Sequence, residues 1–84
     1  MDLTEIYNAL ALSKPKRRKI NRVIKRAKRK DISYKRLRNI GKYLPGFMYC
    51  IYHHKDTPEN PEDKKYSYNE VVSMLEDYQN FLNR

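Results

Sequence analysis

Positive charge in this sequence is concentrated in residues 14–42. That segment holds 15 Lys and Arg side chains and one acid, Asp31, for a net charge of +14, whereas the whole 84-residue chain carries +9. A helix formed here has almost no acid–base pairs at i,i+4 to neutralise it. Lysine and arginine displace counterions from a nucleic-acid backbone and bind it without sequence preference. The segment therefore predicts a phosphate-binding face. The alternatives are a solvated face that only keeps the chain soluble, an anionic membrane or an acidic protein surface.

The predicted contact residues within this segment are of two kinds. Arg36, Arg38 and Asn39 are able to read base edges, Arg at guanine and Asn at adenine, although contact with phosphate or water explains them too. Tyr43 lies beside them and is the tyrosine best placed to stack on a base. The other residues are expected to touch backbone phosphate. The full predicted set is Lys16, Arg17, Arg18, Arg22, Lys25, Arg26, Arg29, Lys35, Arg36, Arg38, Asn39, Lys42 and Tyr43.

A second group of reactive side chains follows in Cys50, His53, His54 and Asp56. These residues are able to bind a metal, but no partner pair stands elsewhere in the sequence, and a strand would send the two histidines to opposite faces. Acid–base cleavage of RNA by the histidines would need a nucleophile or a second positioned group. No Gly-rich phosphate loop or Ser/His/Asp pattern is present. We therefore expect neither an enzyme nor a cofactor or metal, and the single cysteine excludes an intramolecular disulfide.

Amphipathic periodicity predicts two helices before residue 31. Asp2 and Glu5 resemble a capping box for a helix over about residues 3–12. Pro15 suits the first position of a second helix, which runs to about residue 30 with one narrow apolar side and bases around the rest.

Ser33 is the expected N-cap of a third helix, which ends at Pro45-Gly46. The break between the second and third helices is short, and the third exposes Lys, Arg and Asn side chains. This arrangement is compatible with a helix-turn-helix, in which the third helix would enter the major groove.

The C-terminal half is expected to contain a hairpin and a last helix. Residues 47–52 are aromatic and apolar and favour a strand, with a short buried helix as the alternative. Residues 64–68 would pair back on that strand across an exposed loop, in the place of a wing. Ser67 and Glu70 form an S-x-x-E capping box that predicts a helix over about residues 68–83.

These elements predict one small, mainly α domain over residues 1–84, helix-turn-helix-like in its N-terminal part. A bundle of four or five helices is the alternative fold. The longest apolar run is six residues and the N-terminus lacks a signal-peptide pattern, so we expect an intracellular, cytoplasmic protein that does not enter a membrane.

The predicted function is nucleic-acid binding, with DNA favoured over RNA. One alternative is a small interaction protein, of the kind found in phages and mobile elements, that docks on a nucleoprotein machine through its acidic C-terminal third. Another is a basic protein associated with RNA or the ribosome.

Overall fold

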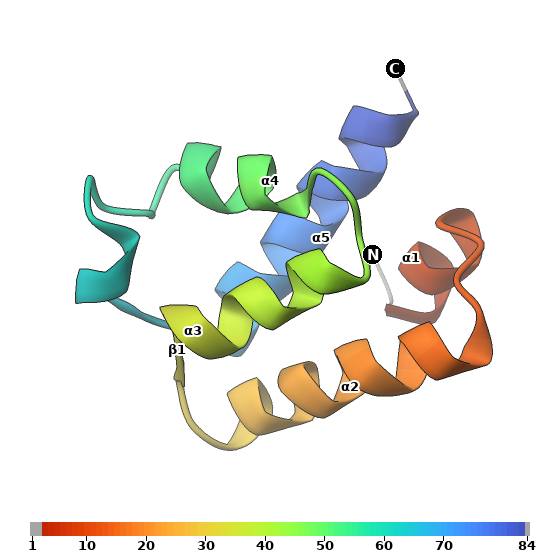
Figure 1. Cartoon of the computed structure of the whole chain (residues 1–84), viewed down its shortest axis with the longest axis horizontal. Coiled ribbons are helices and arrows are strands. Elements are labelled where there is room, and N and C mark those ends of the chain that lie inside the picture. The colour runs from red at the N-terminus through yellow and green to blue at the C-terminus, as the bar shows by residue number, and fades with distance from the viewer. Residues whose placement is uncertain (1–2, 84) are drawn as a thin grey trace.

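The computed structural model describes residues 3–83, and they are mainly helical, which confirms the predicted class (Figure 1). No helix in this range is both long and apolar enough to cross a membrane. The elements in chain order are α1 (Leu3–Ala9), α2 (Lys14–Arg29), β1 (Ile32–Ser33), α3 (Tyr34–Leu37), the 3₁₀-helix η1 (Arg38–Lys42), α4 (Phe47–His53), the 3₁₀-helix η2 (Pro61–Asp63), β2 (Lys65–Tyr66) and α5 (Tyr68–Leu82).

Helix α5 is the centre of the packing, because it contacts α1, α2 and α4. Its buried residues Val71, Met74, Leu75 and Tyr78 follow the spacing of one helix face. The predicted capping box is confirmed: Ser67 Oγ accepts a hydrogen bond from the Glu70 backbone N–H, and Glu70 Oε1 accepts one from the Ser67 N–H, both at 3.2 Å. In Figure 1, α5 passes behind α3 and α4, and α2 runs along the lower edge.

A tight turn joins α1 to α2. The Leu12 N–H donates to the Tyr7 carbonyl and the Ala11 N–H to the Asn8 carbonyl, which is the pattern of a Schellman motif. The C′ position of that motif is left-handed, and here Ala11 occupies it with a φ of 53°. Helix α1 therefore ends at Ala9, before the predicted residue 12. The predicted Asp2–Glu5 capping box lies outside the described residues, since it needs Asp2.

The predicted third helix forms, but only its first turn is an α-helix. Ser33 is its N-cap as expected, and its Oγ accepts from the Arg36 backbone N–H at 3.3 Å. After Leu37 the chain tightens into η1, in which side chains three residues apart lie one above the other. Leu37 and Ile40 have that spacing, and both are fully buried.

Residues 47–52 form most of α4, so the favoured strand is wrong and the alternative, a short buried helix, is the one that forms. Phe47, Cys50 and Ile51 are buried, whereas Tyr49 and Tyr52 are exposed, which is a helical rather than an alternating pattern. α4 packs on α5, and the Phe47 ring meets the Tyr78 ring edge-on at 5.8 Å. Tertiary packing thus overrides the β-propensity of the aromatic residues.

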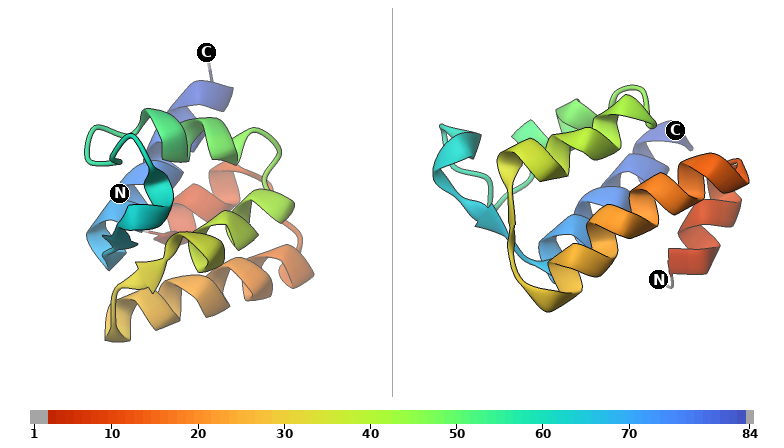
Figure 2. Two further views of the ribbon diagram at one scale, coloured as in Figure 1. Left: turned by 60° about the vertical axis from the view of Figure 1, so that its left-hand side comes forward. Right: turned by 60° about the horizontal axis from the view of Figure 1, so that its bottom comes forward.

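The predicted hairpin and wing are also wrong, because β2 pairs with β1 instead. Ile32 lies opposite Tyr66, and Ser33 lies opposite Lys65, in an antiparallel pair (Figure 2). Both Ile32 and Tyr66 are buried, and the Tyr66 hydroxyl donates to the Pro61 carbonyl at 2.8 Å. The short strand expected near residues 64–68 therefore exists, but it fixes the start of α3 rather than extending from the domain.

Candidate nucleic-acid interface

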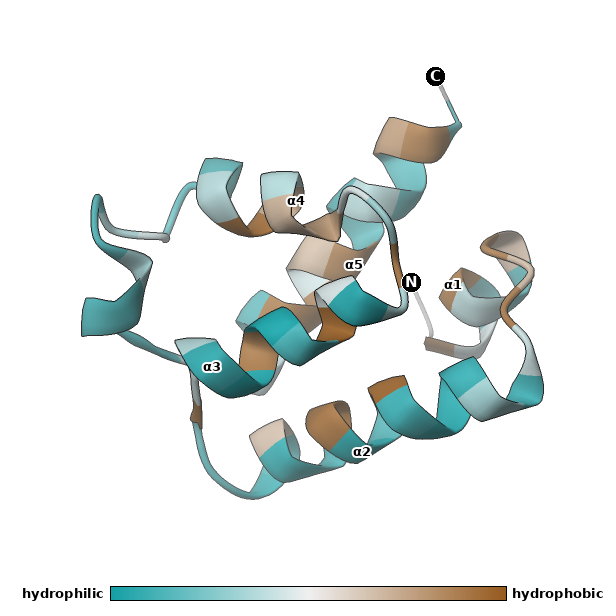
Figure 3. Cartoon of the chain, viewed as in Figure 1, coloured by the Kyte–Doolittle hydropathy of each residue, from teal (hydrophilic) through white to brown (hydrophobic). Residues whose placement is uncertain are grey.

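Helix α2 exposes most of its charge because only a narrow stripe of it is buried. Ile20, Ile24 and Ala27 face the core, and Val23 at the edge of the stripe is half-buried. The remaining surface is hydrophilic along most of the helix (Figure 3). The prediction of a helix buried on one narrow side is confirmed.

Two adjoining pockets lie between α2 and the α3–η1 segment. Both are lined by Arg26 from α2 and Arg36 from α3, so they are neighbours, and we call the two together the basic groove. The larger pocket has a volume of about 470 Å³ and is lined by Arg26, Arg29, Lys30, Asp31, Ile32, Ser33, Arg36 and Lys65. The smaller one, of about 150 Å³, is lined by Arg22, Val23, Arg26, Arg36 and Asn39.

The groove has a strong excess of positive charge. Its lining includes one carboxylate, Asp31, against six cations, which are Arg22, Arg26, Arg29, Lys30, Arg36 and Lys65. None of these six side chains makes an ion pair or a hydrogen bond to another residue in the described range. Unneutralised cations gathered in neighbouring pockets raise the local concentration of anions.

Five of the predicted contact residues line this groove: Arg22, Arg26, Arg29, Arg36 and Asn39. Sequence reasoning missed two of its cations. Lys30 belongs to the basic segment and was left out of the predicted set although it follows directly on Arg29. Lys65 had no signal in the sequence, because only the pairing of β2 with β1 brings it to the groove.

Other predicted residues lie elsewhere. The Arg17 side chain, on α2, holds the α1–α2 turn by two hydrogen bonds. Its Nε donates to the Leu12 carbonyl at 2.9 Å, and its Nη2 donates to Asn8 Oδ1 at 3.0 Å. This side chain therefore has a structural role. Arg18, Lys25 and Lys42 are exposed and line none of these pockets.

Two further pairs line separate pockets. Lys16 and Tyr43 lie in a pocket beside the end of α5 that also contains Leu82. Lys35 and Arg38 line a pocket that includes the acid Glu62. Nine of the thirteen predicted residues thus line the basic groove or one of these two pockets, and the other four do not. Tyr43 is not among the residues of the groove.

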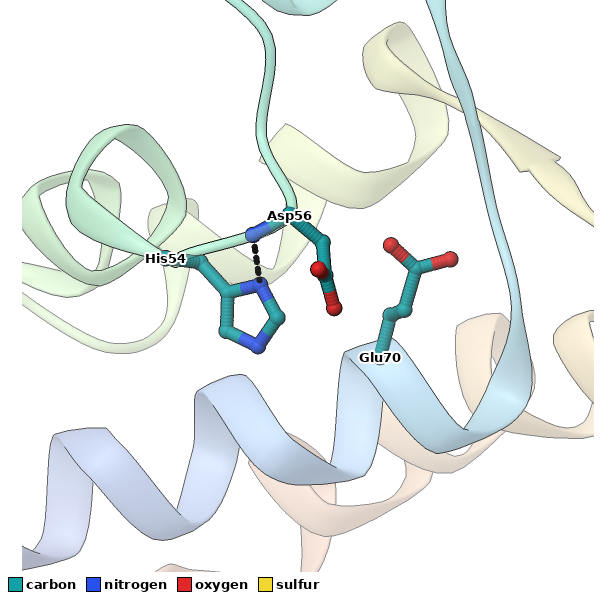
Figure 4. Close-up of side chains that lie close together, drawn as sticks. All are labelled: His54, Asp56 and Glu70. Carbon is teal, nitrogen blue, oxygen red and sulfur yellow. Dashed lines mark hydrogen bonds between the residues drawn. The ribbon is translucent and has the colours of Figure 1, made fainter.

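The histidines separate, as the sequence analysis expected, although a helix end rather than a strand separates them. His53 is exposed and stacks on Tyr49 with 4.0 Å between ring centroids, whereas His54 is buried. The His54, Asp56 and Glu70 side chains converge beside α5, with candidate ligand atoms within 4.8 Å of one another (Figure 4).

Local hydrogen bonds account for that convergence. His54 Nδ1 accepts from the Asp56 backbone N–H at 3.3 Å, which leaves Nε2 to donate to Ser73 Oγ at 3.2 Å. Glu70 holds the α5 capping box and an ion pair with Lys64 at 3.0 Å. A metal ion at this place would have to displace these partners.

No protein-family model matches the chain, and comparisons with curated proteins and with solved structures also find no match. Inferences about function therefore rest on the chemistry of the surface, on which the basic groove brings together six cations and one acid.

Proposed function

We propose that the basic groove binds the phosphate backbone of a nucleic acid. The observation that carries this proposal is that six cations, from α2, its C-cap Lys30, α3 and β2, line two neighbouring pockets and have no ion-pair partner between residues 3 and 83. A segment that served only for solubility would not need arginines of two different helices in the lining of the same pockets, as Arg26 and Arg36 are. Arginine in particular offers paired donors that match phosphate oxygens.

An extended polyanion fits the surroundings of the groove better than a small anion or a membrane. Exposed Arg18 and Lys25 continue the positive surface along α2, whose 16 residues span about 24 Å. A membrane-surface helix would place large apolar side chains beside its cations, and the apolar groove residues Val23 and Ile32 are half-buried and buried instead.

Duplex DNA is the target we favour, and backbone contact is the mode. In a helix-turn-helix the reading helix stands out from the domain so that its side chains reach base edges. Here Arg36 and Asn39 line a concavity together with Arg26, and α3 is a single α-helical turn. That geometry favours phosphate contact by both walls of the groove over base reading by α3–η1.

Binding as a function of salt tests this proposal. If six phosphates are neutralised, log K against log salt should have a slope of about −5 for a short DNA duplex and about −4 for single-stranded oligothymidine. A duplex of RNA in the same fluorescence-anisotropy assay tests the RNA alternative. The absence of binding at low salt, or a slope shallower than about −2, would overturn the proposal.

The alternative function, docking on a nucleoprotein machine, is supported by a different surface. Aromatic side chains on α4 and α5 are exposed next to an acid, on elements that contribute nothing to the basic groove.

A further inference from the structure

A pocket between α4 and α5 has chemistry opposite to that of the basic groove. It has a volume of about 270 Å³ and is lined by Tyr49, Cys50, His53, Asp77, Asn80 and Phe81. None of the Lys and Arg residues between positions 3 and 83 is among the lining residues. We call it the aromatic–acidic pocket.

Its aromatic rings are exposed and yet held in place. The side chains of Tyr49 and Phe81 are 55% and 43% exposed, and their rings stack at a centroid distance of 5.7 Å. Tyr49 also stacks on His53, so one column of rings joins the two helices. Rings fixed in this way lose little conformational freedom when a ligand binds.

The acid of the pocket has no partner of its own. Asp77 is exposed and forms no ion pair or hydrogen bond with another residue of the described range. Burial, and after it the negative charge of Asp77, raises the pKa of the Cys50 thiol. Asp77 lines the pocket together with Tyr49, Cys50 and His53 of α4, so its carboxylate contributes a negative charge there.

We propose that the aromatic–acidic pocket docks an arginine or lysine side chain from an extended segment of a partner protein. Asp77 would pair with the cation, and the partly exposed Phe81 ring, at the end of the stacked column, would attract it through its π-electrons. A phosphate backbone is a poor occupant because the lining residues described by the structure offer it a carboxylate and no Lys or Arg. This docking function goes beyond nucleic-acid binding and does not depend on it.

A peptide titration followed by backbone-amide NMR tests the docking proposal. The probe is a short acetylated and amidated peptide of alternating arginine and serine, and its citrulline analogue is the uncharged control. The basic segment 14–42 carries +14 and repels this peptide, so binding is expected only on the acidic C-terminal part of the chain, and the variants below distinguish the pocket from its other acids. We expect shifts confined to α4 and the C-terminal half of α5 with the arginine peptide and none with the citrulline peptide.

Three variants locate the site. Asp77→Asn and Phe81→Ser each change an exposed side chain of the pocket and should weaken peptide binding about threefold or more. Glu59→Gln removes an exposed acid that lines no pocket described here and should leave the affinity unchanged. A double variant of the basic groove, Arg26→Glu with Arg36→Glu, should retain the shifts at α4 and α5, which separates this proposal from the nucleic-acid one.

Several results would overturn the docking proposal. One is the absence of shifts up to about 1 mM peptide, which would mean a free energy of binding weaker than about −4 kcal/mol. Another is equal loss of affinity in the Glu59→Gln and Asp77→Asn variants. A third is concentration-dependent shifts at the same residues without peptide, which would identify a second copy of the chain as the occupant.

Discussion

Arg26 on α2 and Arg36 on α3 line the same two pockets, one from each wall of the basic groove. The chain between them leaves α2, forms β1 and turns into α3, and β1 is fixed by its pairing with β2. The packing of α2 against η1 completes the groove. A phosphate in the groove is therefore expected to contact both arginines, which come from different predicted helices.

Substitutions of these two arginines should have the same effect. Arg26→Gln and Arg36→Gln should each weaken binding on every sequence tested and reduce the salt slope by about one unit, since each removes one phosphate contact. Arg38→Gln is the matched control, because Arg38 lines a different pocket with Glu62. Fluorescence anisotropy over a salt series gives the slopes.

A difference between the two variants would argue against this mode. If Arg36→Gln costs about 1–3 kcal/mol only on a DNA sequence selected from a random pool, then α3 reads bases, and the helix-turn-helix interpretation is correct. If Arg38→Gln lowers the slope as much as Arg26→Gln, the charge of the chain as a whole, and not the groove, binds the nucleic acid.

Removing the acid of the groove should strengthen binding. Asp31 is the carboxylate among the lining residues, so Asp31→Asn takes away a repulsive charge close to the bound phosphates. We expect the dissociation constant for duplex DNA to fall several-fold at low salt, with little change at high salt because exposed charges are screened. Asp77→Asn, which lies on α5 outside the groove, should produce no comparable gain.

The core should be sensitive to truncation within α5. Leu75 is fully buried, and Leu→Ala in such a site costs about 2–5 kcal/mol, which is most of the stability expected of a domain of this size. Urea denaturation should therefore find Leu75→Ala largely unfolded. Leu82, in the same helix, is 51% exposed, and Leu82→Ala should cost about 1 kcal/mol or less. A Leu75→Ala protein that melts like the parent would mean that α5 is peripheral.

Replacing Ala11, whose backbone is in the left-handed region, by glycine should stabilise the folded protein. Its φ of 53° is costly for alanine and free for glycine, so Ala11→Gly should raise the free energy of unfolding by about 0.5–1 kcal/mol. The same substitution at Ala9, the last residue of α1, should lower it, because glycine disfavours helical backbone. Opposite signs in denaturant titrations confirm the Schellman turn, and equal signs contradict it.

The Lys64–Glu70 ion pair should make stability depend on pH. Burial by itself would raise the pKa of Glu70, but hydrogen bonds from Lys64 and Ser67 outweigh it, so the pKa lies below its ordinary value of 4.5. Such a carboxyl stabilises the fold above the unfolded pKa, and this contribution is lost as the pH falls through the folded value. The stability difference between the parent and Glu70→Gln should thus be largest near neutral pH and shrink below 4.5.

Denaturant titrations at a series of pH values measure this difference, with Glu59→Gln as a control for an exposed acid. A difference that stays constant down to the acid range would show that Glu70 acts only as a hydrogen-bonding cap, since glutamine retains part of that function.

The features that the sequence by itself determined are local ones. The Ser67–Glu70 capping box, the Ser33 N-cap and the buried stripe of α2 each depend on residues within a few positions of one another, and each was predictable. The concentration of bases in residues 14–42 was likewise plain from the sequence. These features predicted the helices α2, α3 and α5, the buried side of α2 and the positive sign of the charged surface.

The tertiary structure decided which of those charges meet. Lys65 reaches the basic groove only because Tyr66 pairs with Ile32. These two residues are far apart in the sequence, so no local pattern encodes their contact. Residues 47–52 become a helix because Phe47 and Ile51 pack together on one side, against α5, although their types favour a strand. Strand pairing and the burial of a helix face are set by partners that are distant in the sequence, and for that reason the shape of the groove became visible only in the folded chain.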